Sequence, residues 1–296
     1  MTNVLISLFG NLNTFIQYAP GTETNTDLGD LNASAVAAKK RIISIISTDV
    51  FAAIASLSRG EAFETLRLAM ANLTLANQLI FDTVARKKSE ANIYKYEMEA
   101  MKRGYMENYF NAMDSLLQWL STQTVTDDDT TSAPALWRKT RYFTLISSCK
   151  IATAEDFDMI YPIDLSYLFF FRTVPFQREC LSERLGSYYH RITDENKESI
   201  TPLLELALAK KTIAKALRRF DILEFPPSIR NLFDSHTSTR SGKDEQTQAA
   251  ELATQLDAEA DELISSVDAL LMDSTQTDYS TTTSYNHPED KIIMLP

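Results

Sequence analysis

Two long stretches of the chain carry apolar residues at helical spacing. Between Glu61 and Ile80 these residues follow one another at steps of three, four and seven positions. Between Tyr94 and Leu120 every step is three or four positions. Such spacing places the apolar side chains on one face of an α-helix. The pattern therefore predicts two long amphipathic helices, the second about 40 Å long at 1.5 Å per residue.

Shorter periodic segments predict further helices along the rest of the chain. The predicted segments are 31–47, 48–54, 153–160, 173–192, 193–220 and 243–272. Residues 3–9 are interpreted as a short strand or extended lead-in, and the polar segment 121–134 as a surface loop. The expected fold is mainly α, a multi-helix bundle with long amphipathic helices, an extended arm and an extended C-terminal tail.

The chain is expected to divide into three regions. Residues 1–192 form a helical domain with an arm at about 83–93, residues 193–273 form a helical region that ends in an acidic helix, and residues 274–296 form a tail. The acidic helix is expected to pack through an apolar stripe. Its members are Leu252, Leu256, Leu263, Val267 and Leu270.

The net charge of −11 is concentrated near the C-terminus. Residues 241–296 hold two basic and twelve acidic side chains, whereas the first 240 residues hold 27 basic and 28 acidic ones. A general nucleic-acid binder has a basic face and usually an excess of basic residues. The sequence shows neither, and its small basic clusters, such as 210–211 and 218–219, are interpreted as solvated helix faces.

Candidate chemistry is sparse. The 296 residues include seven glycines, and no two of them fit a phosphate-binding G-x-G-x-x-G or G-x-x-x-x-G-K-[ST] loop. The three histidines form no H-E-x-x-H motif, and Cys149 and Cys180 form no C-x-x-C pair. We therefore expect no enzyme activity, no cofactor and no metal site.

The sequence also predicts where the protein is found. The first fifteen residues lack the cationic start of a secretory signal, and no run reaches the roughly 18 apolar residues that a membrane helix needs. The longest apolar run, 167–171, is interpreted as core. The protein is expected to stay in the cytoplasm where it is made.

Two segments are candidates for binding other proteins. Residues 83–93 fit neither helix face and carry Arg86, Lys87 and Lys88, so they are interpreted as an extended arm or a bent helix junction. The tail ends in a short apolar run after a polar spacer, a layout typical of a peptide that docks in a groove or adds to a sheet; the alternative is a frayed end. The run comprises Ile292, Ile293, Met294 and Leu295.

Four phrases, together with the order of the elements, resemble a known family. They are NVLISLF at 3–9, LRLAMANL at 66–73, IYKYE at 93–97 and NYFNAMDSLL at 108–117. Over about residues 1–190 the chain resembles the head–tail connector (adaptor) proteins of tailed phages, in particular uncharacterised proteins of phages and prophages of Bacteroidetes-type hosts. The acidic last third departs from that family, whose members are usually shorter.

The resemblance implies a structural virion protein that forms a ring in the phage neck and joins the portal to the tail. Its partners would be copies of itself, the portal protein and further neck or tail proteins. Genomic DNA would be only passing cargo, and no membrane would be involved. The protein would lie at the head–tail junction of the virion, and in the host cytoplasm during assembly.

Two other classes of function remain open from the sequence. One is a cytosolic helical protein-binding module, such as a regulator or a chaperone-like protein, which predicts a monomer or dimer. The other is an enzyme with an unfamiliar active site, for which the sequence offers no constellation of catalytic residues.

Overall fold

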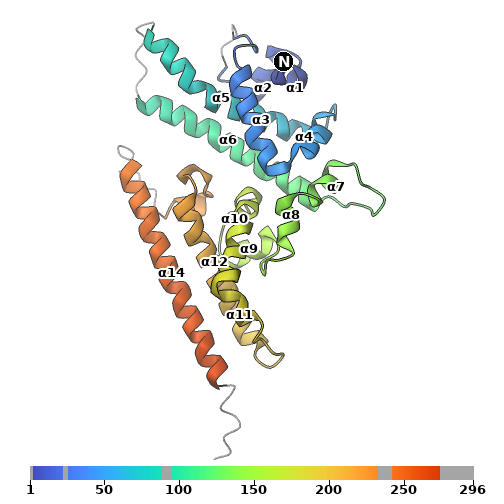
Figure 1. Cartoon of the computed structure of the whole chain (residues 1–296). Coiled ribbons are helices and arrows are strands. Elements are labelled where there is room, and N and C mark those ends of the chain that lie inside the picture. The colour runs from blue at the N-terminus through green and yellow to red at the C-terminus, as the bar shows by residue number, and fades with distance from the viewer. Residues whose placement is uncertain (1–2, 23–25, 89–94, 233–241, 274–296) are drawn as a thin grey trace, which may run out of the picture.

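The computed structural model describes residues 3–22, 26–88, 95–232 and 242–273, apart from the side chains of 82–88, 95, 96, 242–244 and 273. Within these ranges every regular element is a helix, which confirms the mainly α fold (Figure 1). The elements are α1 Val4–Phe9, α2 Leu12–Tyr18, α3 Asn32–Ile46, α4 Thr48–Ala55, α5 Glu61–Lys88, α6 Lys95–Thr122, α7 Ala133–Arg138, α8 Arg141–Ile146, α9 Ala154–Ile160, α10 Tyr167–Cys180, the π-helix η1 Leu181–Leu185, α11 Gly186–Tyr189, α12 Lys197–Arg219, the 3₁₀ helix η2 Ile222–Glu224, α13 Pro227–Arg230 and α14 Gly242–Asp273.

Two helical hairpins dominate the molecule (Figure 1). Helices α5 and α6 form the first, with α3 packed against α5, and α12 and α14 form the second. Helix α10 lies between them and packs against both α6 and α12. The buried apolar residues form one continuous core across these elements. The boundary expected at residue 192 stays a prediction, and apolar contacts cross it.

The first segment is a helix, so the strand or extended lead-in expected at 3–9 is wrong. The side chain of Asn3 accepts hydrogen bonds from the backbone N–H groups of Leu5 (2.9 Å) and Ile6 (3.3 Å), as an N-cap residue does. The spacing of the buried Leu5, Leu8 and Phe9 is helical rather than alternating. A six-residue helix is too short for periodicity alone to separate it from a strand.

Helix α10 begins six residues before the expected start at Thr173. The hydroxyl of Ser166 accepts a hydrogen bond from the Phe169 N–H (3.1 Å) and caps the helix. Pro175 therefore lies inside the helix rather than in its first turn. The apolar run 167–171 forms the first turns and is buried, which confirms that it belongs to the core.

The extended arm expected at about 83–93 is wrong for its first part, because α5 continues to Lys88. Residues 83–88 are helical, and residues 89–93 lie outside the described residues. The C-terminal tail with Ile292, Ile293, Met294 and Leu295 also lies outside the described residues.

Helix α14 packs on α12 through a stripe that overlaps the one expected. Leu256 and Val267 are buried as predicted, Leu252 and Leu263 are partly buried against the core, and Leu270 is 39% exposed. Three alanines occupy further buried positions of the stripe. The buried stripe is Ala249, Ala253, Leu256, Ala260, Ile264, Val267 and Leu271.

The two halves of the molecule are joined by a charged cluster. Glu224, from the turn after α12, pairs with Arg172 of α10 and with Arg41 of α3 (3.4 Å). Burial raises the pKa of Glu224, and the two nearby guanidinium groups act in the opposite direction. The cluster ties the first hairpin and its α3 support to the second.

Candidate protein-interaction surfaces

Large apolar side chains remain exposed at the free end of the α5–α6 hairpin. Ile80 is 64% exposed, Phe81 57% and Met101 42%. A hydrogen bond from Asn108 Nδ2 to Asn72 Oδ1 (3.2 Å) fixes the register of the two antiparallel helices. Ile80 and Phe81 lie eight and nine residues beyond Asn72 on α5, and Met101 lies seven residues before Asn108 on α6. All three therefore lie at about the same level, and we call them the hairpin end.

The same helices are well buried nearer the centre of the molecule. On α5, Leu66 and Met70 are fully buried, and on α6 Tyr109 and Met113 are fully buried. The stripe of methionine and tyrosine residues on α6 is thus ordinary core at that level. The apolar faces of both helices become exposed only toward the hairpin end. Sequence periodicity continues through that point, so it did not distinguish Ile80 from a core residue.

The predicted basic residues belong to this same end of the molecule. Arg86, Lys87 and Lys88 occupy the last turn of α5, and their side chains lie outside the described part. Over residues 81–103 the sequence has six basic and four acidic side chains. The apolar hairpin end therefore lies in a stretch of chain with a small positive charge.

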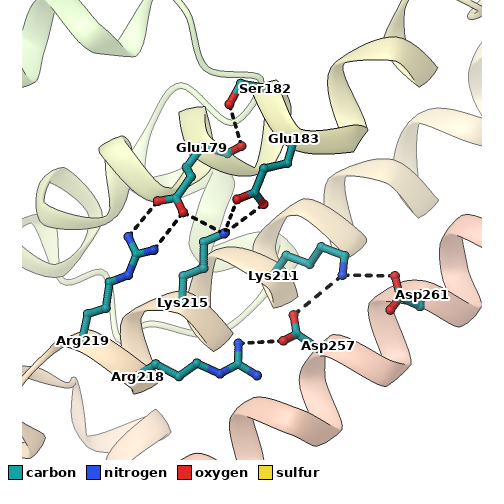
Figure 2. A network of polar contacts seen from close by, with 9 residues as sticks. All are labelled: Glu179, Ser182, Glu183, Lys211, Lys215, Arg218, Arg219, Asp257 and Asp261. Carbon is teal, nitrogen blue, oxygen red and sulfur yellow. Dashed lines mark hydrogen bonds and ion pairs between the residues drawn. The ribbon is translucent and has the colours of Figure 1, made fainter.

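Helix α12 carries a row of basic side chains that pair with acids on both sides (Figure 2). Lys215 contacts Glu179 of α10 (3.0 Å) and Glu183 of η1 (2.9 Å), and Arg219 contacts Glu179 (2.7 Å). Two hydrogen bonds from Arg219, together with the one from Lys215, lower the pKa of Glu179 to about 2. This side of the row fastens α12 to α10.

The other side of the row fastens α12 to α14. Lys211 lies 3.1 Å from Asp261 and 3.7 Å from Asp257, and Arg218 lies 2.7 Å from Asp257 (Figure 2). The interpretation of residues 210–211 and 218–219 as simply solvated is therefore wrong. Part of the acidic charge of α14 is used to hold the helix in place.

The four-residue spacing of the basic side chains on α12 is the sequence signal for this row. Lys211, Lys215 and Arg219 recur every four residues, which places them along one side of α12. Their acidic partners come from helices distant in the sequence. Sequence periodicity does not pair one helix with another, so the ion pairs themselves were not predictable.

A buried carboxylate at the start of α10 was also missed. Asp114 of α6 accepts hydrogen bonds from the Leu168 N–H (2.7 Å) and the Ser166 hydroxyl (2.9 Å). Burial raises the pKa of Asp114 to about 6, although both hydrogen bonds favour its ionised form. The side chain positions α10 against the first hairpin.

Other kinds of site are absent from the described ranges. In these ranges no group of three or more histidine, cysteine, aspartate or glutamate side chains is arranged to hold a metal ion. None of the helices described is both long and apolar enough to cross a membrane. Cys149 and Cys180 are free thiols, and burial raises the pKa of each to about 11.

Comparison with known proteins finds no match to this chain among family models, curated proteins or solved structures.

Proposed function

We propose that this chain is a structural protein that forms a ring in the neck of a tailed-phage particle and joins the portal to the tail. The observation that carries the proposal is the hairpin end, where Ile80, Phe81 and Met101 remain exposed on a rigid helical body. Large apolar side chains left exposed at one level of a helical hairpin are candidates for contact with another protein.

The energetics favour a partner at this position. Covering apolar surface is worth about 25 cal/mol per Å². The hairpin end lies beyond the part of α5 and α6 that the core covers, so further folding of the described residues does not bury it. A second protein chain supplies the cover.

The resemblance supplies the setting for this binding. It points to copies of the same chain as neighbours in the ring, and to the portal and other neck or tail proteins above and below. Residues 1–190, which carry the resemblance, include the whole of the first hairpin.

Quantitative mass spectrometry of purified phage particles from the source tests the proposal. We expect the protein in the particles at a copy number comparable to that of the portal subunit and far below that of the major capsid protein. A copy number similar to that of the capsid protein would instead indicate a tail-tube or capsid-decorating role.

Complete absence from the particles would contradict the proposal. The remaining interpretation would then be the cytosolic helical binding module, for which the same hairpin end is the binding surface. Co-purification of this protein with the portal from infected cells would show whether the two associate before the particle is finished.

A further inference from the structure

Helix α14 is attached to the rest of the molecule mainly through α12. It packs on α12 and lies along one edge of the molecule (Figure 1). Its buried stripe runs from Ala249 to Leu271, about 33 Å at 1.5 Å per residue. Because α12 is its main packing partner, moving α14 away leaves the packing among the other helices in place. The contact between α14 and α12 is therefore a separable unit of the fold.

Opposite charges line this contact. Most of the basic side chains come from α12, and two more come from η1 and from the residues after α11. They are Arg184, Arg191, Lys210, Lys211 and Arg218, and the carboxylates of α14 that they contact are Asp257, Glu259, Asp261 and Asp268. The face that α14 covers thus has an apolar centre and a basic rim, which fits an amphipathic helix with acidic flanks. Every copy of the chain carries both this face and a helix that fits it.

A single stretch of chain connects α14 to the preceding helices. The described residues before it end at Leu232, and α14 begins at Gly242. The ten peptide links between these two residues span at most about 35 Å. This length exceeds the 8–10 Å that separates the axes of packed helices. It is therefore compatible with docking on the α12 of the same chain or on that of an adjacent copy.

The chemistry of the contact is the same within one chain and between two chains, because the face and the helix are identical in every copy. The local concentration of α14 decides between the two arrangements. In an isolated chain, the connection keeps α14 close to its own α12. In an assembly held by the hairpin end, a second α14 is also close, at an effective concentration on the order of millimolar.

We propose that neighbouring copies in the assembly exchange α14, so that the α14 of one copy docks on the α12 of the next. This inference rests on the proposed function, because the ring supplies the neighbouring copies. Each copy gives its α14 to one neighbour and receives that of the other. Exchange of an identical element between copies is a low-cost way to fasten an assembly, since it needs no new contact surface.

Paired charge reversals in the full chain test the exchange. The α12 variant is Lys210→Glu with Arg218→Glu, and the α14 variant is Asp257→Lys with Glu259→Lys. These changes reverse the two ion pairs that join Lys210 to Glu259 and Arg218 to Asp257. A chain with all four substitutions is the first control, because its charges are complementary again within one chain.

A second control matches the charge change of the α14 variant at other positions of the same helix. It is Glu251→Lys with Glu262→Lys, which reverses two exposed side chains of α14. Both side chains lie outside the buried stripe, so these changes leave the contact with α12 intact. Any effect of net charge alone on association appears in this control.

Mixing the two variants separates exchange from docking within one chain. Each variant alone has only mismatched contacts, whether α14 docks on its own chain or on an identical copy. In the mixture, the original α14 of one variant fits the original α12 of the other, and the two reversed faces also fit each other. These matched contacts form only between different chains. Association through the hairpin end is common to all the variants and therefore does not produce the difference.

Sedimentation velocity measures association, and hydrogen exchange with mass spectrometry measures the protection of α14. We expect the α14 amides of each variant alone to exchange at least tenfold faster than in the wild type, because a helix without its packing partner is marginal in water. In the equimolar mixture the rate returns to within threefold of the wild type, and a complex with equal numbers of the two variants appears. Both controls keep the wild-type rate within threefold.

Three outcomes would overturn the inference. The mixture contains no complex beyond those of the separate variants and its α14 amides stay unprotected; or the separate variants protect α14 as well as the wild type does; or the chain with four substitutions does not regain the protection. None of these results depends on the copy number of the protein in phage particles. Failure of the exchange is therefore distinguishable from failure of the proposed function.

Discussion

The two helical hairpins of this molecule differ in how completely their apolar faces are buried. Helix α14 is held on α12 by a buried stripe from Ala249 to Leu271, flanked by ion pairs of the basic row. The α5–α6 hairpin is buried near the centre of the molecule and uncovered at its free end, where Phe81 is 57% exposed. The exposed apolar residues of α14, Leu270 and Met272, lie in its last turn, where the chain continues.

This difference assigns different roles to the two hairpins. In the second hairpin, the buried apolar stripe and the ion pairs join α14 to α12. In the structure this contact is made entirely between residues of one chain. In the first, the apolar surface continues past the point where the molecule covers it. The second hairpin is therefore interpreted as a structural element, and the first carries the surface that we propose binds another protein.

The largest expected effect is the loss of a core side chain from the second hairpin. Ile264 is fully buried in the stripe of α14. We expect Ile264→Ala to lower the free energy of unfolding by about 2–5 kcal/mol, measured by urea denaturation. The matched change at the hairpin end, Ile80→Ala, is expected to alter it by less than about 0.5 kcal/mol. Equal losses at both positions would remove the distinction between the hairpins.

The two hairpins also differ in the expected pH dependence of stability. The pKa of Asp114 is raised from 3.8 to about 6, so ionisation is harder in the folded protein, and stability falls as the pH rises from about 4 to 6. This loss is about 3 kcal/mol at most, at 1.36 kcal/mol per pKa unit. Asp114→Asn is expected to flatten the stability profile in this window.

The carboxylate of Glu179 acts in the opposite direction. Its pKa is lowered from 4.5 to about 2, so its contribution is present above about pH 4.5 and is lost as the pH falls toward 2. Glu179→Gln is expected to remove that part of the acid destabilisation. Urea titrations of both variants between pH 2 and pH 7, read against the wild type, check the two windows; identical profiles for all three proteins would contradict both assignments.

Glycine-to-alanine changes are expected to have opposite signs in the two regions. Gly186 directly follows the π-helix and lies two residues before Tyr188, which contacts Asp268 of α14. A Cβ at Gly186 would lie 2.6 Å from the backbone oxygen of Leu181. We expect Gly186→Ala to destabilise the fold by about 1–3 kcal/mol. A Cβ at Gly104 of α6 meets nothing within 4 Å, so Gly104→Ala is expected to stabilise it by about 1 kcal/mol. Thermal unfolding of both variants measures the signs, and a shared sign would show that one of the two environments is described wrongly.

The sequence predicts two of the long helices well because their periodicity extends over many turns. The second long helix begins and ends within two residues of the prediction, and the last helix within one. The first long helix begins at Glu61 as predicted but continues eight residues beyond the predicted end at Ile80, because residues 81–88 do not follow its apolar face. Short elements were predicted less well: residues 3–9 form a helix, and α10 starts at Tyr167 instead of Thr173. Their starts depend on single capping side chains.

The candidate surfaces depend on contacts between helices, which periodicity does not contain. On α14 the leucine pattern predicts only part of the buried stripe, because alanines such as Ala253 and Ala260 also lie in the contact. Ile80 belongs to the apolar face of α5 in the sequence, and only the packing shows that the core ends before it. A cleft beside α9 collects residues from α6, α8, α9 and α10, so no local pattern predicts it.

The central claim is that the hairpin end joins one copy of the chain to another. Its most direct test is also the one with the smallest expected effect on stability. The measurement is sedimentation velocity of the full chain and of Phe81→Ser over a wide concentration range. Urea denaturation is expected to show free energies of unfolding that agree within about 0.5 kcal/mol, because Phe81 is a surface residue. The account predicts that the wild type self-associates and that Phe81→Ser weakens this association at least tenfold. Equal association of the two proteins, or a wild type that stays monomeric throughout, would contradict it.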